Sequence, residues 1–121
     1  AKIDMITGEN QKYAGKNEPS ITDGPLSEAG FEAPKHITYD ANGNLILTDG
    51  SAIRFIDMQK EEVYTIAGST TSIYKDNYDD IMTDPLFFDP QGIVADDNHN
   101  IYVIDQKGTY GNIFIRKISM Q

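Results

Sequence analysis

The stretch FDPQGIVADDNHNIYVID, residues 88–105, decides the fold, because FEAPKHITYDANGNLILTD at residues 31–49 is a near-copy of it. Aligned without gaps from Pro34 and Pro90, the two copies share residues at some positions and apolar character at others. The matching pairs are Ile37/Ile93, Asp40/Asp96, Asn42/Asn98, Asn44/Asn100, Leu45/Ile101, Leu47/Val103 and Asp49/Asp105. An internal repeat of this kind is typical of an architecture built from similar, stacked units.

The first copy predicts four short strands that follow one another along the chain. Asn42-Gly43 separates HITYD (36–40) from NLILT (44–48), and this dipeptide between apolar runs indicates a hairpin because both residues tolerate positive φ. SAIRFID (51–57) alternates apolar and polar residues, and EEVYTIAG (61–68) follows after a short turn. The prediction is an antiparallel four-stranded meander.

The second copy repeats this plan with one insertion and an incomplete end. It predicts strands at 92–96, 100–105 and 112–118, with six extra residues, QKGTYG, before the last strand. The sequence ends where the fourth strand of this copy is expected. IDMITG (3–8) matches VYTIAG (63–68), so it is predicted to be a fourth-type strand that precedes the first copy.

Four motifs in this pattern resemble the NHL repeat, whose unit is a four-stranded blade of a β-propeller. They are VYTIAG (63–68), Phe88 with PQGI (90–93), NIYV (100–103) with Asp105, and IRKI (115–118). The resemblance covers nearly the whole chain and implies an all-β fold, a partial propeller of about two blades made of four-stranded antiparallel meanders. It further implies the boundaries of three segments, namely 1–8 as the outer strand of a preceding or swapped blade, 31–68 as the first blade, and 88–121 as a second blade lacking its outer strand.

Sheet packing leads to the same architecture by a physical argument. A lone four-stranded sheet of this length cannot hide both of its apolar faces, so it must stack on similar neighbours. Two blades cannot close a ring, because propellers usually have about 4 to 8 of them. We therefore expect either further blades from a longer parent chain or self-association of copies, in which the strand at 3–7 completes the last blade of a neighbour.

Composition argues against several classes of function. Lys and Arg total 10 against 19 acidic residues, and the resulting net charge of −9 repels the phosphates of nucleic acids and anionic lipids. No stretch approaches the roughly 20 apolar residues of a membrane helix, so membrane insertion is not expected. The chain has no cysteine and no Walker, GxSxG or HExxH motif, so we expect neither a cofactor nor a catalytic residue.

The predicted binding surface lies at the end of the blades from which the long loops emerge. Segment 69–89 is acidic with interleaved tyrosines, which suits stacking on sugars, hydrogen bonding to hydroxyls or contact with a basic protein. Segment 9–30 is polar without a sustained period and is predicted to be an irregular surface loop at the same end. The candidate ligand-binding residues are Tyr74, Tyr78, Asp79, Asp80, Lys107, Tyr110, Lys35 and His36, with Tyr13 and Phe31 expected on the same surface. Alternatively, the tyrosines only pack the loops onto the sheets and the aspartates maintain solubility.

No metal site is predicted from the repeated Asp-x-Asn-x-Asn motif. Residues 40–44 and 96–100 copy the opening of an EF-hand calcium loop but lack its glycine at the sixth position and its glutamate at the twelfth. Turn formation is the better interpretation of both segments. His36 and His99 are expected at opposite ends of the blades, where they cannot share a metal.

Four charged residues recur at equal places in the two copies. Asp49 and Asp105 end the second strands, and we expect them to accept hydrogen bonds from the backbone amides of the turn that follows. Arg54 and Arg116 are expected to have an architectural role, such as pairing with the aspartate of a neighbour.

These observations favour a non-catalytic binding or scaffold module whose partner is a protein or a glycan. The resemblance adds that such propellers belong to bacterial extracellular or cell-surface proteins that handle glycans or adhesion. The alternative is a fragment of a propeller lyase or hydrolase with a metal in the central channel. The alternative is disfavoured because the inner strands HITYD and GIVAD offer only His36 near the channel mouth.

Overall fold

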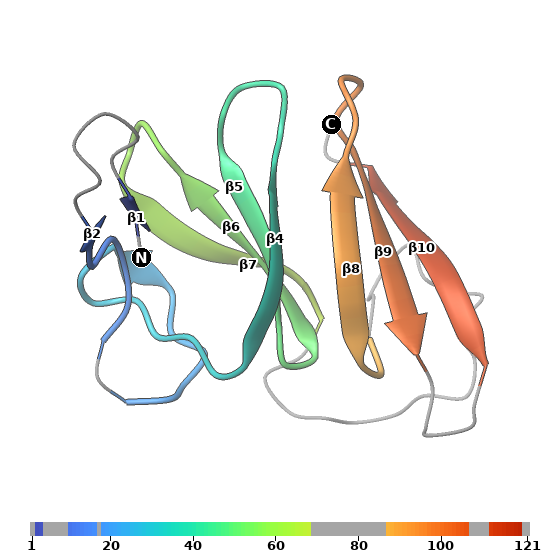
Figure 1. Cartoon of the computed structure of the whole chain (residues 1–121), viewed down its shortest axis with the longest axis horizontal. Helices are drawn as coiled ribbons and strands as arrows, with labels where there is room; N and C mark the ends of the chain where they lie inside the picture. Colours follow the sequence, from blue (N-terminus) through green and yellow to red (C-terminus); the bar gives the residue numbers. More distant parts are fainter. Residues whose placement is uncertain (1, 4–9, 17, 69–86, 107–111, 120–121) are drawn as a thin grey trace.

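The computed structural model describes residues 2–3, 10–16, 18–68, 87–106 and 112–119, and these residues form ten antiparallel β-strands in three sheets (Figure 1). The strands are β1 (Lys2–Ile3), β2 (Asn10–Gln11), β3 (Gly24–Pro25), β4 (Pro34–Tyr39), β5 (Leu45–Asp49), β6 (Ala52–Asp57), β7 (Glu62–Gly68), β8 (Pro90–Ala95), β9 (Asn100–Gln106) and β10 (Ile113–Ser119). The predicted all-β class is confirmed. In the described part of the chain, no helix has the length and apolar character needed to cross a membrane.

The first sheet has the strand order β3-β7-β6-β5-β4, so four strands consecutive in sequence are also neighbours in space. This is the predicted antiparallel meander. The β4–β5 turn closes as the sequence indicates, with Gly43 at φ 83° and the Asp40 carboxylate accepting the backbone amides of Asn42 and Asn44. The additional strand β3 is a difference from the irregular loop predicted for 9–30, because Gly24 and Pro25 pair with Val63 and Glu62 of β7.

The second sheet contains β8, β9 and β10 in the order β10-β9-β8. Its first turn repeats the geometry of the first sheet, since Asp96 accepts the amides of Asn98 and Asn100, and His99 adopts φ 65° at the position of Gly43. Among the described residues no strand pairs with the free edge of β10. The strand predicted at 3–8 is described only at its start, where Lys2 and Ile3 pair with Gln11 and Asn10 of the same chain.

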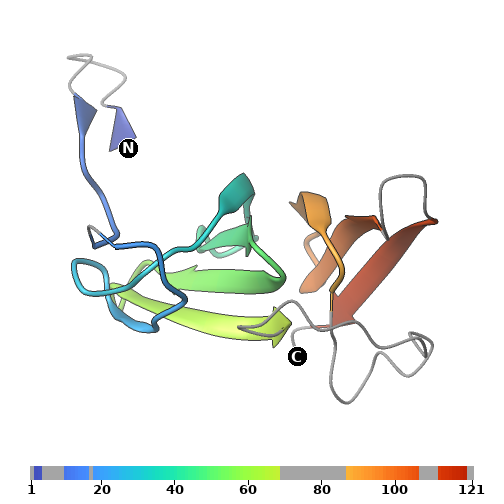
Figure 2. The same cartoon turned by 90° about the horizontal axis from the view of Figure 1, so that it is seen from below.

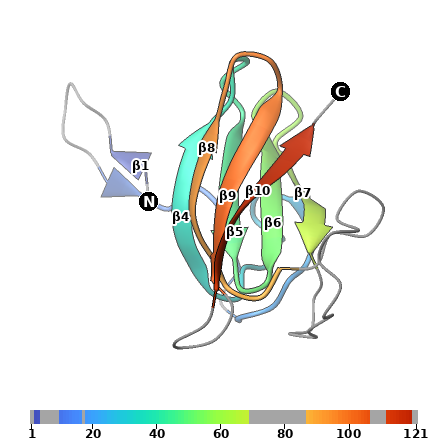
Figure 3. The same cartoon turned by 90° about the vertical axis from the view of Figure 1, so that its right-hand side faces the viewer.

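The two large sheets pack against each other and share one hydrophobic core. Figures 1 and 2 show β4 and β8 side by side, in agreement with the contacts between these strands, and Figure 3 shows the two sheets overlaid with their strands in similar directions. The core buries Ile46 and Ile53 from the first sheet against Ile101 and Val103 from the second, with Phe87 beside them. Each such fully buried side chain contributes about 1.5–3 kcal/mol to folding.

A second, smaller core lies on the opposite face of the first sheet. Leu47, Ile56 and Val63 point to this side, where the segment before β4 covers part of them with Ala29 and the half-buried Phe31. The alternation of side chains along a strand explains why consecutive residues such as Ile46 and Leu47 belong to different cores.

Candidate functional site

The end of β5 carries a buried carboxylate that fixes the segment leading into β4. Asp49 accepts the backbone amides of Glu32 and Ala33, at 2.9 and 2.6 Å from Oδ1, and its Oδ2 lies 2.8 Å from a guanidinium nitrogen of Arg54. Both side chains are fully buried, and the Arg54 guanidinium lies over the Phe31 ring at 5.0 Å from its centre. We call this arrangement of aspartate, arginine and phenylalanine the clasp.

The second repeat builds the same clasp from equivalent residues. Asp105 accepts the amides of Phe88 and Asp89 at 3.0 and 2.9 Å, and Arg116 donates to it at 3.1 Å. The Arg116 guanidinium lies 4.7 Å from the centre of the Phe87 ring. Phe87, not Phe88, is therefore the counterpart of Phe31, as the gapless alignment from the two prolines already requires.

The clasps correct one prediction and refine another. Asp49 and Asp105 were expected to accept amides of the turn that follows them, but the amides they accept belong to residues 16 or 17 positions earlier. A local sequence pattern does not reveal these hydrogen bonds, because they join the end of the second strand to residues just before the inner strand, far away in the sequence. The architectural role predicted for Arg54 and Arg116 is confirmed, and each pairs with the aspartate of its own sheet.

Arg54 also fixes the segment that crosses the first sheet. Its guanidinium donates to the carbonyl oxygens of Gly30 and Thr22 at 2.7 and 3.0 Å and lies 3.3 Å from the half-exposed carboxylate of Asp23. A buried guanidinium needs such acceptors, because desolvation of an unpaired charge costs several kcal/mol (about 3–5 when one partner is removed). Arg54 thus holds segment 22–30 at both of its ends, and Asp49 holds the two residues Glu32 and Ala33 that follow.

The strand register brings the attachment points of both long segments to one end of the molecule, which we call the long-loop end. Pairs there are Pro34 with Asp49, Ala52 with Gly68, Pro90 with Asp105, and Ile113 with Gln106. Segments 69–86 and 107–111 therefore start and finish at this end. Six of the predicted ligand-binding residues lie in these segments, outside the described residues: Tyr74, Tyr78, Asp79, Asp80, Lys107 and Tyr110.

The other two predicted residues, Lys35 and His36, lie together at the long-loop end. Both inner strands begin with a proline followed by an irregularity in the pairing, which leaves the residues after the proline outside the regular ladder. Lys35 donates to the Asp89 carboxylate at 2.9 Å and so links the first repeat to the second. His36 is exposed, and its backbone amide donates to the Thr48 hydroxyl at 3.1 Å.

The opposite end carries a small recess of mixed polar and apolar lining between the two hairpin turns. It has a volume of about 260 Å³ and is lined by Asp40, Asn42, Asn44, His99 and Asn100 above Phe55. Hydrogen bonds from the backbone and side-chain amides of Asn100 hold the pKa of the Asp96 carboxyl below its ordinary value.

The turn interpretation of both Asp-x-Asn-x-Asn motifs is confirmed by these bonds. In the part of the chain that the structure describes, no three His, Cys, Asp or Glu side chains are placed to hold a metal ion. His99 lines the recess without having been selected from the sequence. In the sequence, His99 aligns with Gly43 of the first repeat. A non-glycine residue at this turn position must adopt a positive φ, and this is the feature that distinguishes His99.

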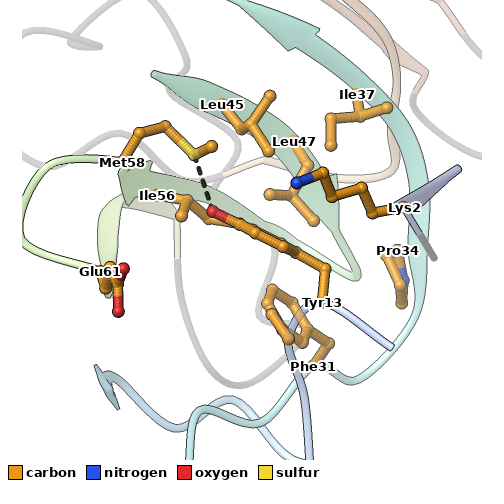
Figure 4. A pocket seen from close by; sticks show the side chains of 11 residues that line it. Lys2, Tyr13, Phe31, Pro34, Ile37, Leu45, Leu47, Ile56, Met58 and Glu61 are labelled. Atoms are coloured by element: carbon orange, nitrogen blue, oxygen red, sulfur yellow. Dashed lines mark hydrogen bonds between the residues drawn. The ribbon is translucent and has the colours of Figure 1, made fainter. Parts of the chain in front are cut away.

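An apolar groove of about 640 Å³ lies on the face of the first sheet that points away from the second (Figure 4). Its floor consists of Leu45, Leu47 and Ile56, and the charged side chains of Lys2 and Glu61 lie among the residues that line it. Tyr13 crosses the groove, and its hydroxyl donates to the Met58 sulfur at 3.2 Å. This corrects the prediction for Tyr13, which reaches the β6–β7 turn at the opposite end from the long loops.

Comparisons with known proteins support the fold and leave function open. No protein-family model matches the chain, and no curated protein matches it. Its structure is similar to that of a structural genomics protein of unknown function from Bacteroides thetaiotaomicron, with a TM-score of 0.73 and 24% identity. The match covers 91% of this chain and 27% of that one, so the chain spans about a quarter of the length of this neighbour. At this identity the likeness concerns the fold alone.

Proposed function

We propose that the chain forms two blades of an NHL-type β-propeller and acts as a non-catalytic binding module of a bacterial extracellular or cell-surface protein. The ligand is a glycan bound at the long-loop end by segments 69–89 and 107–111. In this arrangement the sheets are a scaffold, and the residues that differ between the repeats make the contacts.

The observation that supports the proposal is the convergence of the attachment points on a rigid edge. The Asp49 and Asp105 clasps fix the backbone at the start of each inner strand, and the ion pair of Lys35 with Asp89 joins the two repeats there. Loops of variable sequence held on a rigid frame are where binding residues concentrate in proteins. The composition of segment 69–89, with aspartates among tyrosines, provides ring faces and hydroxyl acceptors together.

A glycan array tests the proposal with the wild-type chain and the variants Tyr78→Ala and Tyr110→Ala. We expect binding to a subset of the glycans and a loss of about 10-fold or more in each variant, because an aromatic contact contributes about 0.5–1.5 kcal/mol beyond its buried area. The matched control is Tyr39→Ala. Tyr39 is 71% exposed on β4, away from the long-loop end, so its removal should leave glycan binding unchanged.

Two results would contradict the glycan proposal. An array without any bound glycan would leave a basic protein surface as the remaining ligand class for this acidic edge. Equal losses in Tyr39→Ala and in the two loop variants would show that binding does not occur at the long-loop end.

A further inference from the structure

The interface between the two large sheets joins opposite faces of the two repeats. We call face A the side that carries Leu45 and Leu47 in the first repeat and Ile101 and Val103 in the second. Face B is the other side. In the core between the sheets, Ile101 and Val103 on face A of the second repeat pack against Ile46, Ile53 and Phe55 on face B of the first. A face A and a face B are therefore complementary in shape and chemistry within a single chain.

Among the described residues, neither large sheet packs on face A of the first repeat, which is covered in part by Tyr13 and by the segment before β4. Ile37 is 61% exposed there, whereas its counterpart Ile93 packs into the core between the sheets. Leu45 and Leu47, the counterparts of Ile101 and Val103, form the floor of the apolar groove shown in Figure 4. The groove thus occupies the place at which the equivalent face of the second repeat receives its neighbouring sheet.

Face B of the second repeat is open in the same way. Ile104 and Ile115 are 43% and 73% exposed, and they line an apolar recess of about 340 Å³ with Val94 and Tyr102. In the first repeat the counterpart of Ile104 is Thr48 and the counterpart of Ile115 is Ile53, and both are buried. In the part of the chain that the structure describes, one apolar face of each kind is therefore left without a sheet packed on it.

We propose that face B of the second repeat in one copy of the chain docks on face A of the first repeat in another copy. The proposed contact repeats the internal interface between copies, and it does not depend on the glycan-binding proposal. Each copy then has one donor face and one acceptor face, which makes the association head-to-tail rather than two-fold symmetric. Exposed apolar surfaces at positions that are buried in the equivalent repeat are the reason to expect association.

Sedimentation velocity over a range of concentrations tests this contact with two charge variants. Ile37→Asp blocks face A and Ile115→Asp blocks face B, and both side chains are exposed enough for the variant chains to keep their folds. We expect wild type to self-associate, and each variant alone to associate at least about 100-fold more weakly, because a carboxylate buried in an apolar interface is unpaired. Gln59→Asp on the exposed β6–β7 turn is the control and should associate as wild type does.

Mixing the two variants provides the decisive measurement. Ile37→Asp retains a normal face B and Ile115→Asp retains a normal face A, so an equimolar mixture should form a 1:1 complex that grows no further. Circular dichroism and thermal unfolding of each variant confirm that the chains are folded.

Three outcomes would overturn the proposal. A wild-type chain that stays monomeric at every concentration would assign the two faces to other segments or partners. Association of either variant alone as strong as that of wild type would indicate contact between like faces or exchange of the strand at 3–8. A mixture of folded variants that remains monomeric would show that face B does not recognise face A.

Discussion

The two repeats contain the same clasp, but the clasps anchor different segments of the chain. In both, a buried aspartate at the end of the second strand holds two backbone amides, an arginine of the third strand and a phenylalanine below the guanidinium. The first repeat continues into a fourth strand and carries segment 22–33 across its outer face, whereas the described part of the second stops at β10. The residues that the repeats share hold the strand ends, whereas the segments attached to those ends differ between the repeats.

The largest expected effect is the loss of either clasp arginine. Arg54→Met leaves the Asp49 carboxylate buried without its cation, and we expect the free energy of unfolding to fall by about 3–5 kcal/mol in urea denaturation. Arg116→Met should cause a loss of similar size, since Asp105 is also fully buried. Lys60→Met, at an exposed turn, is the matched control and should change stability little. The equivalence of the repeats would fail if only one of the two arginine variants were destabilised.

A smaller loss is expected at the end of the fourth strand, which only the first repeat has in the described chain. Gly68 has φ 87°, and a Cβ atom added there would meet the Ser51 carbonyl oxygen and lie 2.7 Å from the Ala52 Cα. Gly68→Ala should therefore lower the free energy of unfolding by about 2–3 kcal/mol, from backbone strain and a clash that only a backbone shift can relieve.

Gly43→Ala separates the two contributions in the same denaturation experiment. Gly43 has a similar φ of 83° but open space around the added Cβ, so only the conformational cost of about 1 kcal/mol should remain. Equal losses at Gly43 and Gly68 would show that the β5–β6 turn can move away from β7 to accommodate the added Cβ.

The hairpin turns provide a pH-dependent comparison with a modest effect. Because the folded-state pKa of Asp96 lies below the ordinary 3.8, its hydrogen bonds stabilise the fold above that pH and are lost as pH falls through the folded-state pKa. Asn100→Ala removes the side-chain amide and keeps the backbone donor, so the pKa should rise part of the way towards 3.8. NMR titration of the Asp96 carboxyl carbon measures this rise. Asn44→Ala in the first repeat should leave that titration unchanged, and an equal rise would indicate coupling between the turns.

The smallest effect is expected for the link between the repeats. Lys35 and Asp89 form an ion pair at 2.9 Å with both side chains nearly half exposed, so Lys35→Gln should cost about 0.5 kcal/mol or less. The wild-type and variant stabilities should converge as salt is added, because salt screens exposed charges. A loss that persists at high salt would mean that Lys35 holds the sheets together by packing of its methylene chain.

Local patterns predicted most of the strands, since turn residues and alternating side chains act within a few positions. Asn42-Gly43 and the alternation in 51–57 gave the meander without any tertiary information. Other features depend on residues far apart in sequence and had no local pattern. Three features belong to this group: the pairing of β3 with β7, the backbone amides that donate to Asp49, and the contact of Tyr13 with Met58.

The candidate site was predicted in its position and less well in its composition. Successive connections in an antiparallel meander alternate between the two ends of the sheet, so the order of the strands predicts the end from which the long loops emerge. Lys35 and His36 lie there because each repeat begins its inner strand at that end. The apolar groove was missed because Leu45 and Leu47 appear in the sequence as ordinary core positions. Whether these positions line a groove depends on how many sheets pack against the first sheet, and the sequence of a single repeat does not specify that number.

The clasps also bear on which segment of the chain could be replaced by another sequence. Gly68 ends β7 in close contact with Ser51 and Ala52, and Asp105 accepts hydrogen bonds from the amides of Phe88 and Asp89. The backbone is therefore held in place on both sides of segment 69–86. On either side of that segment, the strand register is therefore set by contacts within the described sheets. For protein engineering, we expect a foreign peptide inserted between Gly68 and Phe87 to leave the strand pairings of both sheets intact.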